Sequence, residues 1–509
     1  MAQSLTTQII SATKWTYLAT FVNVVLQVAV TAILARLLVP GAFGLVAMAT
    51  LVLRFGQYFA QMGVGQAIVQ RRDLSTAHVR AGMWTSVVLG AAFSAVVWAA
   101  APLIAELFRS SQLQPVLRMM GLSFTLTGAS AVAFALLRRD MRFKGIALAD
   151  IAAYAIGYGL VGVSVALTGG GVWSLVAASL TQAATVCIIY NALARPSLTP
   201  VMSRRAYHEL LGFGSTVSVI SFLEFMSTNL DTMVVGRFAG SASLGLYSRA
   251  LSLTGVPMEY LSTSLSKVLF PSFSRIQADQ DRFRKAYIAT LAVAAGVGLP
   301  VSLGMSGAAR ELVAVLLGPQ WGASVSVVRL AALASAAAVL SHFAGVALEA
   351  TGRLREKLAV RGAQLGLFAG LLLLLGQFGL LGYALAFVLS EIAVHIALSW
   401  RMTKDFCMGR SAIISAYRPG LVGGVCACAA LWGESWAGRW LGLGSGLVLV
   451  VQAATGAAVL LVAVLCVARG LVLREVASRG AGTVPGRVAA RLVSWRYHGA
   501  LGDTAEADV

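Results

Sequence analysis

The feature that most constrains this chain is a series of apolar runs, which recur from residue 15 to residue 468 almost without interruption. Each run holds about 20 residues, the length at which a helix crosses the hydrocarbon core of a bilayer. Of the 509 residues, 58% are hydrophobic and 12% are charged, which leaves too little polar surface to cover a water-soluble core. The sequence therefore predicts an all-α polytopic membrane protein.

Dividing the runs at their polar and glycine-rich connections predicts about fourteen membrane-spanning helices. The expected spans are 15–35, 42–69, 82–104, 117–137, 146–168, 172–194, 211–236, 242–270, 286–306, 323–350, 359–376, 379–400, 419–436 and 441–468. The first run follows Lys14, is too long for the core of a signal peptide and leads straight into the second, so we interpret it as an uncleaved helix.

Lysine and arginine residues are concentrated in every second connection. The other connections hold only Arg36, Arg109, Arg237, Arg310 and Arg439. Positive residues accumulate on the cytosolic side of membrane proteins, so this alternation predicts that both termini are cytosolic. The net charge of +19 arises from these connections and from a basic tail, without a stripe of basic residues interleaved with aromatic ones, and we therefore exclude nucleic acid as a partner.

The five cysteines, Cys187, Cys407, Cys426, Cys428 and Cys466, lie mostly inside expected helices and have no spacing typical of a metal site or a disulfide framework. We expect no metal and no cofactor. Every connection is short, so the sequence offers no soluble domain for a separate active site, and we expect that the protein is not an enzyme.

The second half of the chain resembles the first. "RLLVPGAFGL" (36–45) and "RFAGSASLGL" (237–246) both consist of an arginine, seven further residues with a variable sequence, and then Gly-Leu, at an offset of 201. "VLRMMGL" (116–122) matches "VVRLAAL" (327–333), and "MRFK" (141–144) matches "LREK" (354–357). The order of the matches predicts a duplication into two six-helix lobes around a central cavity, related by an axis along the membrane normal. The expected divisions are 1–200 for the N-lobe, 201–405 for the C-lobe, 406–468 for two additional helices and 469–509 for a basic cytosolic tail.

Four segments carry a resemblance to a known family: "ILARLLVPGAFGLVAMATLVLRFGQYFAQMGVGQAIVQRRDLS", "ALLRRDMRFK", "NLDTMVVGRFAGSASLGLYSRA" and "LLGPQWGASVSVVRLAAL". Together they resemble the bacterial oligosaccharide flippases of the multidrug/oligosaccharidyl-lipid/polysaccharide superfamily, over about residues 10–405. The resemblance implies an alternating-access fold in the bacterial inner membrane. It also implies transport of undecaprenyl-diphosphate-linked oligosaccharide repeat units for exopolysaccharide, capsule or O-antigen assembly, with a polysaccharide polymerase and chain-length or export proteins as partners.

A diphosphate requires positive partners, and the guanidinium fork of arginine suits phosphate oxygens. On the second expected helix, Arg54, Gln57, Tyr58 and Gln61 fall on one face. We expect Arg54 to contact the diphosphate, Gln57 and Gln61 to bond sugar hydroxyls, and Tyr58 to belong to the same substrate-binding face; the alternative is a buried hydrogen-bonded seam between helices. Arg249, on the eighth helix, is a second candidate for the diphosphate, or else forms an ion pair with Asp231.

Acidic residues are expensive in a membrane-spanning helix, at about 2.5–3.5 kcal/mol each near the centre. In the seventh helix, Ser221, Glu224, Thr228 and Asp231 share a face, and Asn229 lies beside it. Two interpretations stay open: Glu224 exchanges a coupling proton or sodium ion, or Glu224 and Asp231 are structural partners of Arg54 and Arg249. Glu259, Glu391 and His395 are further candidates for coupling or for pairing between lobes, and Glu391 and His395, four residues apart, are placed to bond each other.

Other classes of protein fit the sequence less well. A multidrug exporter of the same superfamily favours twelve helices and a cavity with few arginines, and a lipid II exporter implies a cavity arginine on the first helix, where this chain has Asn23 and Gln27. A membrane enzyme of polysaccharide assembly requires a large outer loop or an Asp-x-Asp motif. A scaffold without transport activity does not explain the polar faces of the helices.

Overall fold

The computed structural model describes residues 5–60, 68–69, 74–197 and 217–479. Throughout these segments the secondary structure is helical, with short turns between the helices and no strand. The all-α class predicted from the apolar runs is thus confirmed. The side chains of Tyr58 and Glu224, and the whole of Gln61, lie outside the described residues.

The chain forms two compact units. The first ends at Ser248 and also includes Leu316–Gln320, and the second begins at Arg249 and contains the remaining described residues. The predicted division into lobes at residue 200 stays a prediction.

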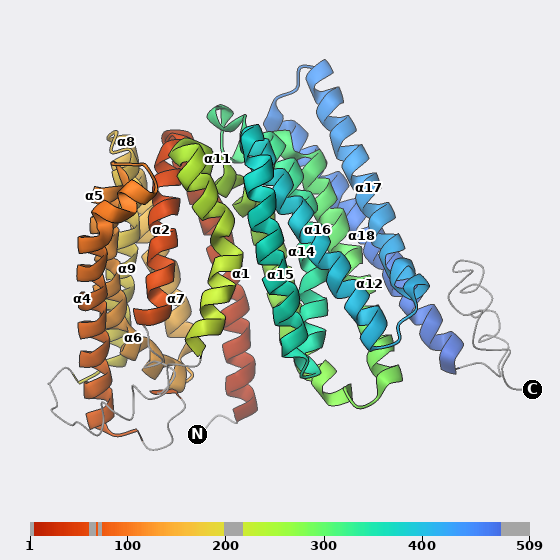
Figure 1. The fold of residues 1–509 in the computed structure, drawn as a ribbon, viewed down its shortest axis with the longest axis horizontal. Helices are drawn as coiled ribbons and strands as arrows, with labels where there is room; N and C mark the ends of the chain where they lie inside the picture. Colours follow the sequence, from red (N-terminus) through yellow and green to blue (C-terminus); the bar gives the residue numbers. More distant parts are fainter. Residues whose placement is uncertain (1–4, 61–67, 70–73, 198–216, 480–509) are drawn as a thin grey trace, which may run out of the picture. The chain divides into compact units, whose positions relative to one another are not determined.

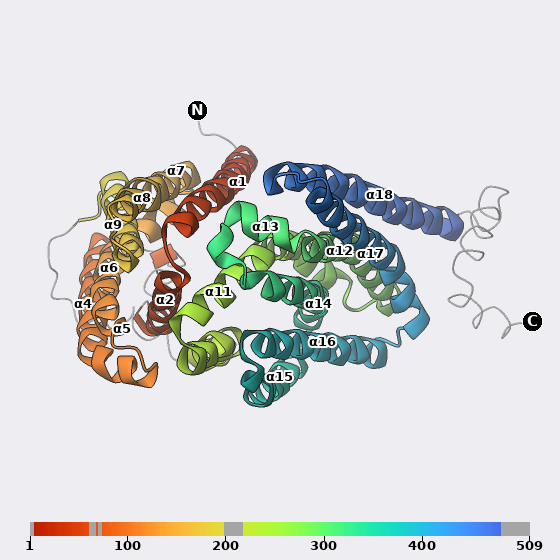
Figure 2. The ribbon, with the colours of Figure 1, turned by 90° about the horizontal axis from the view of Figure 1, so that it is seen from above.

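Figure 1 shows the helices of the first unit in red to yellow-green. They are α1 (Leu5–Leu37), α2 (Pro40–Ala60), α4 (Thr76–Leu107), α5 (Leu113–Gly121), α6 (Ser123–Arg139), α7 (Phe143–Tyr154), α8 (Val163–Leu167), α9 (Val172–Ala194) and the first part of α11 (Val217–Ile276). A π-helical segment, Ala155–Gly162, joins α7 to α8. Helices α4, α6, α9 and α7 lie side by side in that order, as Figures 1 and 2 show.

The second unit begins within α11. Its further helices are α12 (Gln280–Gly307), α13 (Ala309–Leu316), α14 (Ser324–Ala350), α15 (Leu354–Leu375), α16 (Gly379–Asp405), α17 (Arg410–Trp440) and α18 (Ser445–Arg479). Short 3₁₀ turns lie at Pro319–Trp321 and Gly376–Phe378. Helix α12 packs against α14, α17 and α18, so the two helices after residue 405 are anchored on this unit.

The described segments contain ten helical stretches that are long and apolar enough to cross a membrane. One of them, Leu354–Asp405, comprises both α15 and α16, and α2 and α11 are not among the ten. The protein is therefore a multi-pass membrane protein. The number fourteen is consistent with this arrangement and stays a prediction.

Local sequence signals explain where several helices begin and end. The hydroxyl of Ser75 accepts a hydrogen bond from the backbone N–H of His78 at the start of α4, and Asp279 accepts one from Arg282 N–H at the start of α12. Within α11, Gly240 has φ of 80°, so this continuous run is two helices joined at a glycine. The break lies between the expected spans 211–236 and 242–270.

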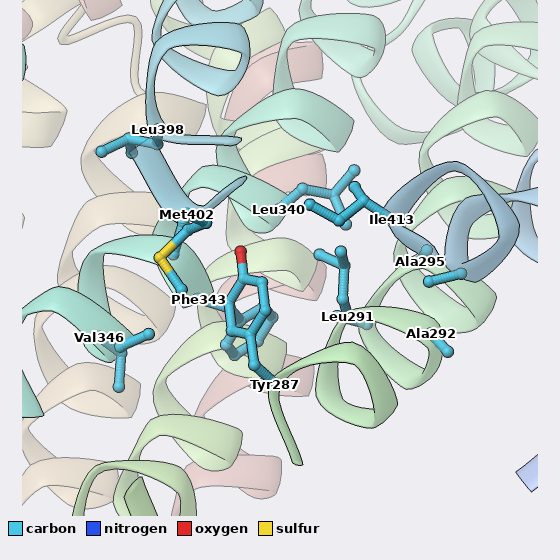
Figure 3. Close-up of a cluster of buried hydrophobic side chains, with 14 of the residues drawn as sticks. Tyr287, Leu291, Ala292, Ala295, Leu340, Phe343, Val346, Leu398, Met402 and Ile413 are labelled. Carbon is cyan, nitrogen blue, oxygen red and sulfur yellow. The ribbon is translucent and has the colours of Figure 1, made fainter. Parts of the chain in front are cut away.

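The core of the second unit is formed by apolar side chains of six helices, α11, α12, α14, α16, α17 and α18. Figure 3 shows Tyr287 and Leu291 of α12 with Leu340 and Phe343 of α14, and with Met402 of α16 on one side. All five side chains are at most 5% exposed. This core includes α16, the helix that carries Glu391 and His395.

Close packing of α17 on α12 depends on a glycine. A Cβ atom added at Gly420 would lie 2.2 Å from the backbone oxygen of Ala295, whereas one added at Gly433 of the same helix would meet no atom within 4 Å. We expect Gly420→Ala to lower the free energy of unfolding by about 1–3 kcal/mol through overpacking. Thermal unfolding of the purified protein in detergent measures this loss. Gly433→Ala is the matched control and should leave the melting temperature unchanged or slightly raised; equal losses in both variants would contradict the packing.

Candidate functional site

Arg54 stands out on α2 because its side chain is exposed. It lies about 21 Å along the helix from Pro40, at a rise of 1.5 Å per residue. Within the part of the chain that the structure describes, its guanidinium has neither a hydrogen bond nor an ion pair. An arginine in this position needs water or an anion, because lipid solvates the charge poorly.

The neighbours of Arg54 are apolar and closely packed. The Phe55 ring lies 5.4 Å from the ring of Phe225 on α11, and a Cβ atom added at Gly56 would lie 2.5 Å from the ring of Phe124 on α6. Gln57 is half-buried. The predicted polar face of α2 thus begins with Arg54 and Gln57, and the side chain of Tyr58 and the whole of Gln61 are not described. The contacts of Phe55 and Gly56 hold α2 in place and so fix the position of Arg54.

Asp231 of α11 is buried, with 4% of its surface exposed, and its carboxylate has specific partners. It accepts hydrogen bonds from the backbone N–H of Thr232 (2.6 Å), from the Thr232 hydroxyl (3.3 Å) and from the hydroxyl of Tyr247 (3.1 Å). Tyr247 lies beyond the break at Gly240, so this bond connects the two helices of α11. The ion pair with Arg249 is not formed between these two described residues.

The remaining polar residues of the predicted set on α11 differ in exposure. Asn229 donates to the backbone oxygen of Phe225 in the preceding turn, at 2.9 Å. Arg249 is half-buried and Glu259 is exposed. Glu224 shares the predicted face with Asp231, and its role stays a prediction because its side chain is not described.

Glu391 and His395 of α16 are directed to different neighbours rather than to each other. The buried carboxylate of Glu391 accepts a hydrogen bond from Gln364 Nε2 of α15 at 2.8 Å, and Gln364 in turn accepts one from Arg361 at 2.7 Å. His395 Nε2 lies 3.2 Å from the hydroxyl of Tyr417 on α17. The bond between Glu391 and His395 expected from their spacing is therefore replaced by bonds to α15 and α17.

The sequence pattern missed three partners in these networks: Tyr247, Gln364 and Tyr417. Each is a polar residue within or beside an apolar span, and that signal was present. Hydropathy shows only that such a side chain must meet protein or water, however, and it does not say which residue lies opposite.

The sequence of this chain is similar to those of several known proteins. Residues 33–326 match the model of a family described as polysaccharide biosynthesis protein. The chain is 24% identical over 422 residues to the lipopolysaccharide biosynthesis protein WzxC of Escherichia coli (strain K12). The aligned residues make up 82% of this chain and 84% of that protein. It is 27% identical over 303 residues to the succinoglycan biosynthesis transport protein ExoT of Rhizobium meliloti (strain 1021), covering 59% and 61% respectively.

Two solved structures share the fold. The lipid II flippase MurJ in an inward closed conformation superimposes with a TM-score of 0.71 at 12% identity, over 90% of this chain and 99% of that one. An inward-facing multidrug resistance MATE family transporter of the MOP superfamily gives 0.57 at 15% identity, over 77% and 95%. The predicted superfamily fold is confirmed. Since the family model covers more than half of the sequence, from residue 33 to residue 326, this chain belongs to the polysaccharide biosynthesis protein family.

Proposed function

We propose that the protein flips undecaprenyl-diphosphate-linked oligosaccharide repeat units across the bacterial inner membrane by alternating access. Membership of the polysaccharide biosynthesis family and the transporter fold support this proposal. The observation that carries it is Arg54, an exposed cation that has no hydrogen bond or ion pair with any described residue, on a helix expected to span the membrane. A lipid-linked diphosphate is an anion that enters a membrane, and its oxygens form an ion pair with such an arginine.

The chemistry of the cargo divides it between two environments. The polyprenyl tail stays in lipid, while the sugars and the diphosphate cross through water-accessible protein. Gln57 and its neighbours on the α2 face bond sugar hydroxyls, and Arg249 is a second contact for the diphosphate. A polysaccharide polymerase and chain-length or export proteins consume the product on the outer side.

The orientation follows from the charges. With the basic connections on the cytosolic side, both termini are cytosolic and the junction between α1 and α2 faces outward. Moving about two negative charges outward across an inside-negative membrane is favourable by roughly 4–5 kcal/mol per 100 mV if the charges remain uncompensated. Voltage therefore drives transport in part, and a proton or sodium ion exchanged at Glu224 contributes the remainder.

The test compares cargoes and gradients in proteoliposomes of the full chain. A fluorescent undecaprenyl-diphosphate oligosaccharide should change leaflets in a protein-dependent manner, and a cationic drug dye should not. Transport of the dye alone would contradict the proposal and favour a drug exporter. An imposed pH or sodium gradient should alter the wild-type rate, and Glu224→Gln should lose that response; a retained response would make Glu224 a structural residue.

A further inference from the structure

The two copies of the repeated motif, 36–45 and 237–246, lie against each other in the structure. A Cβ atom added at Gly44 of α2 would lie 1.7 Å from the backbone oxygen of Ser241. One added at Gly245 would lie 1.9 Å from the backbone oxygen of Pro40. The two helices therefore touch through their backbones, and only glycine fits at either position.

The contact is reciprocal. Ser241 follows Pro40 by 201 residues and Gly245 follows Gly44 by the same 201, the offset between the two copies of the motif. The glycine of each copy thus meets the same position of the other copy, as in an interface related by a two-fold axis. The chain also bends at equivalent places, between α1 and α2 at residues 38–39 and within α11 at Gly240.

Two loops extend this relationship. Each loop belongs to one copy of the repeat and contacts the end of the helix that precedes the motif in the other copy. The amide of Gln320, from the turn between α13 and α14, donates to the backbone oxygens of Ala35 (2.5 Å) and Leu38 (3.2 Å) at the end of α1. Phe108, after α4, packs where a Cβ atom at Gly236 would lie 3.1 Å from its ring. Gly236 follows Ala35 by 201 residues, so both loops cover equivalent positions.

We propose that these contacts form an outer latch, consisting of the crossing of Pro40 and Gly44 with Ser241 and Gly245, and the straps at Gln320 and Phe108. The latch closes the outer end of the transport path and opens once in each cycle; this inference rests on the proposed function. Its residues adjoin Arg36, Arg109 and Arg237, which belong to the sparsely charged connections that the distribution of lysine and arginine places outside.

The chemistry of the latch suits a contact that separates repeatedly. The glycine crossing brings the two helices together through backbone atoms, and its four residues, Pro40, Gly44, Ser241 and Gly245, carry no charge. At the strap, water can replace the Gln320 amide on the carbonyl oxygens that end α1. Opening thus leaves these carbonyl oxygens hydrogen-bonded to water, and glycine has no side chain to rearrange when the crossing closes again.

A disulfide across the crossing tests the inference. A Cβ atom at Gly41 would lie 3.8 Å from the Ser241 hydroxyl oxygen, which is close to the position that a sulfur would take. In a full-length variant with the five native cysteines replaced by serine, Gly41→Cys/Ser241→Cys should form this bond on oxidation, as thiol labelling with a polyethylene-glycol maleimide reports. Flipping should fall to the level of protein-free vesicles and return on reduction.

The matched control places a disulfide between helices of one repeat. The hydroxyls of Ser94 on α4 and Thr125 on α6 lie 2.9 Å apart, so Ser94→Cys/Thr125→Cys also forms a bond on oxidation. Flipping by this variant should be the same before and after oxidation. Flipping that survives complete oxidation of the Gly41–Ser241 pair would overturn the latch.

A second measurement separates failure of the latch from failure of the proposed function. Spin labels at two exposed positions, Ser111 and Ala242, report the separation of the outer ends without any cargo. Two distance populations, reduced to the shorter one by the Gly41–Ser241 disulfide, support the latch even if no lipid-linked sugar is flipped. A single short distance under every condition would overturn it.

Discussion

Arg54→Ala is expected to lower the flipping rate of an undecaprenyl-diphosphate oligosaccharide about tenfold to a hundredfold. The exposed guanidinium has no hydrogen bond or ion pair with any described residue, so we expect its removal to act mainly through its interaction with the cargo. Hydrogen bonds to charged groups contribute about 1.5–3 kcal/mol, and each 1.4 kcal/mol corresponds to a factor of ten. Proteoliposome assays with matched amounts of protein measure the rate, and Arg54→Lys, which keeps the charge but not the fork, should give an intermediate value.

Arg118→Ala is the control for the loss of one positive charge. This arginine of α5 lies over the Trp98 ring, 5.2 Å from its centroid, and is not part of the α2 face. We expect its replacement to leave the flipping rate within about twofold of wild type, since a partly exposed cation–π contact contributes only about 0.5–1 kcal/mol to stability. Equal losses for Arg54→Ala and Arg118→Ala would show that Arg54 has no specific role in binding.

Gly44→Ala is expected to abolish flipping, because the added methyl carbon would lie 1.7 Å from the backbone oxygen of Ser241. That separation is far below any contact distance, so α2 and α11 must move apart and the outer latch cannot close. The melting temperature should fall as well, by the equivalent of about 1–3 kcal/mol. Flipping and thermal unfolding of the same preparation measure both effects.

Gly41→Ala provides the matched control, one turn earlier in the same helix. Its methyl carbon would lie 3.8 Å from the nearest atom outside the local backbone, an ordinary contact, and we expect flipping and stability close to wild type. By the reciprocity of the crossing, Gly245→Ala should behave as Gly44→Ala does. A Gly44→Ala variant that flips as well as Gly41→Ala would contradict the geometry of the crossing.

The membrane-spanning character of the chain was predictable from hydropathy, because the apolar runs are long and their connections carry the charges. The break between the helices near residue 240 was predictable to within a few residues from its glycine and small polar residues. The π-helical segment Ala155–Gly162 was not predictable, because its composition does not differ from that of an apolar α-helix.

The sequence also identified the polar residues that need a partner, but not the partner. Asp231 bonds Tyr247 and Glu391 bonds Gln364, and both choices depend on how the helices are rotated against each other. Hydropathy and spacing along one helix contain no information on that rotation. For the same reason, the matching motifs at 36–45 and 237–246 predicted a duplication without showing that the two copies touch.

The most direct test of the account is leaflet exchange by the wild-type protein alone. Vesicles contain a fluorescent undecaprenyl-diphosphate oligosaccharide in both leaflets, and a membrane-impermeant reductant destroys only the label that faces outward. We predict that protein-free vesicles lose about half of the signal, as expected for a two-leaflet bilayer, whereas vesicles that contain the protein lose nearly all of it. Loss of the same half in both preparations, with and without voltage or pH gradients, would contradict the assignment as a flippase.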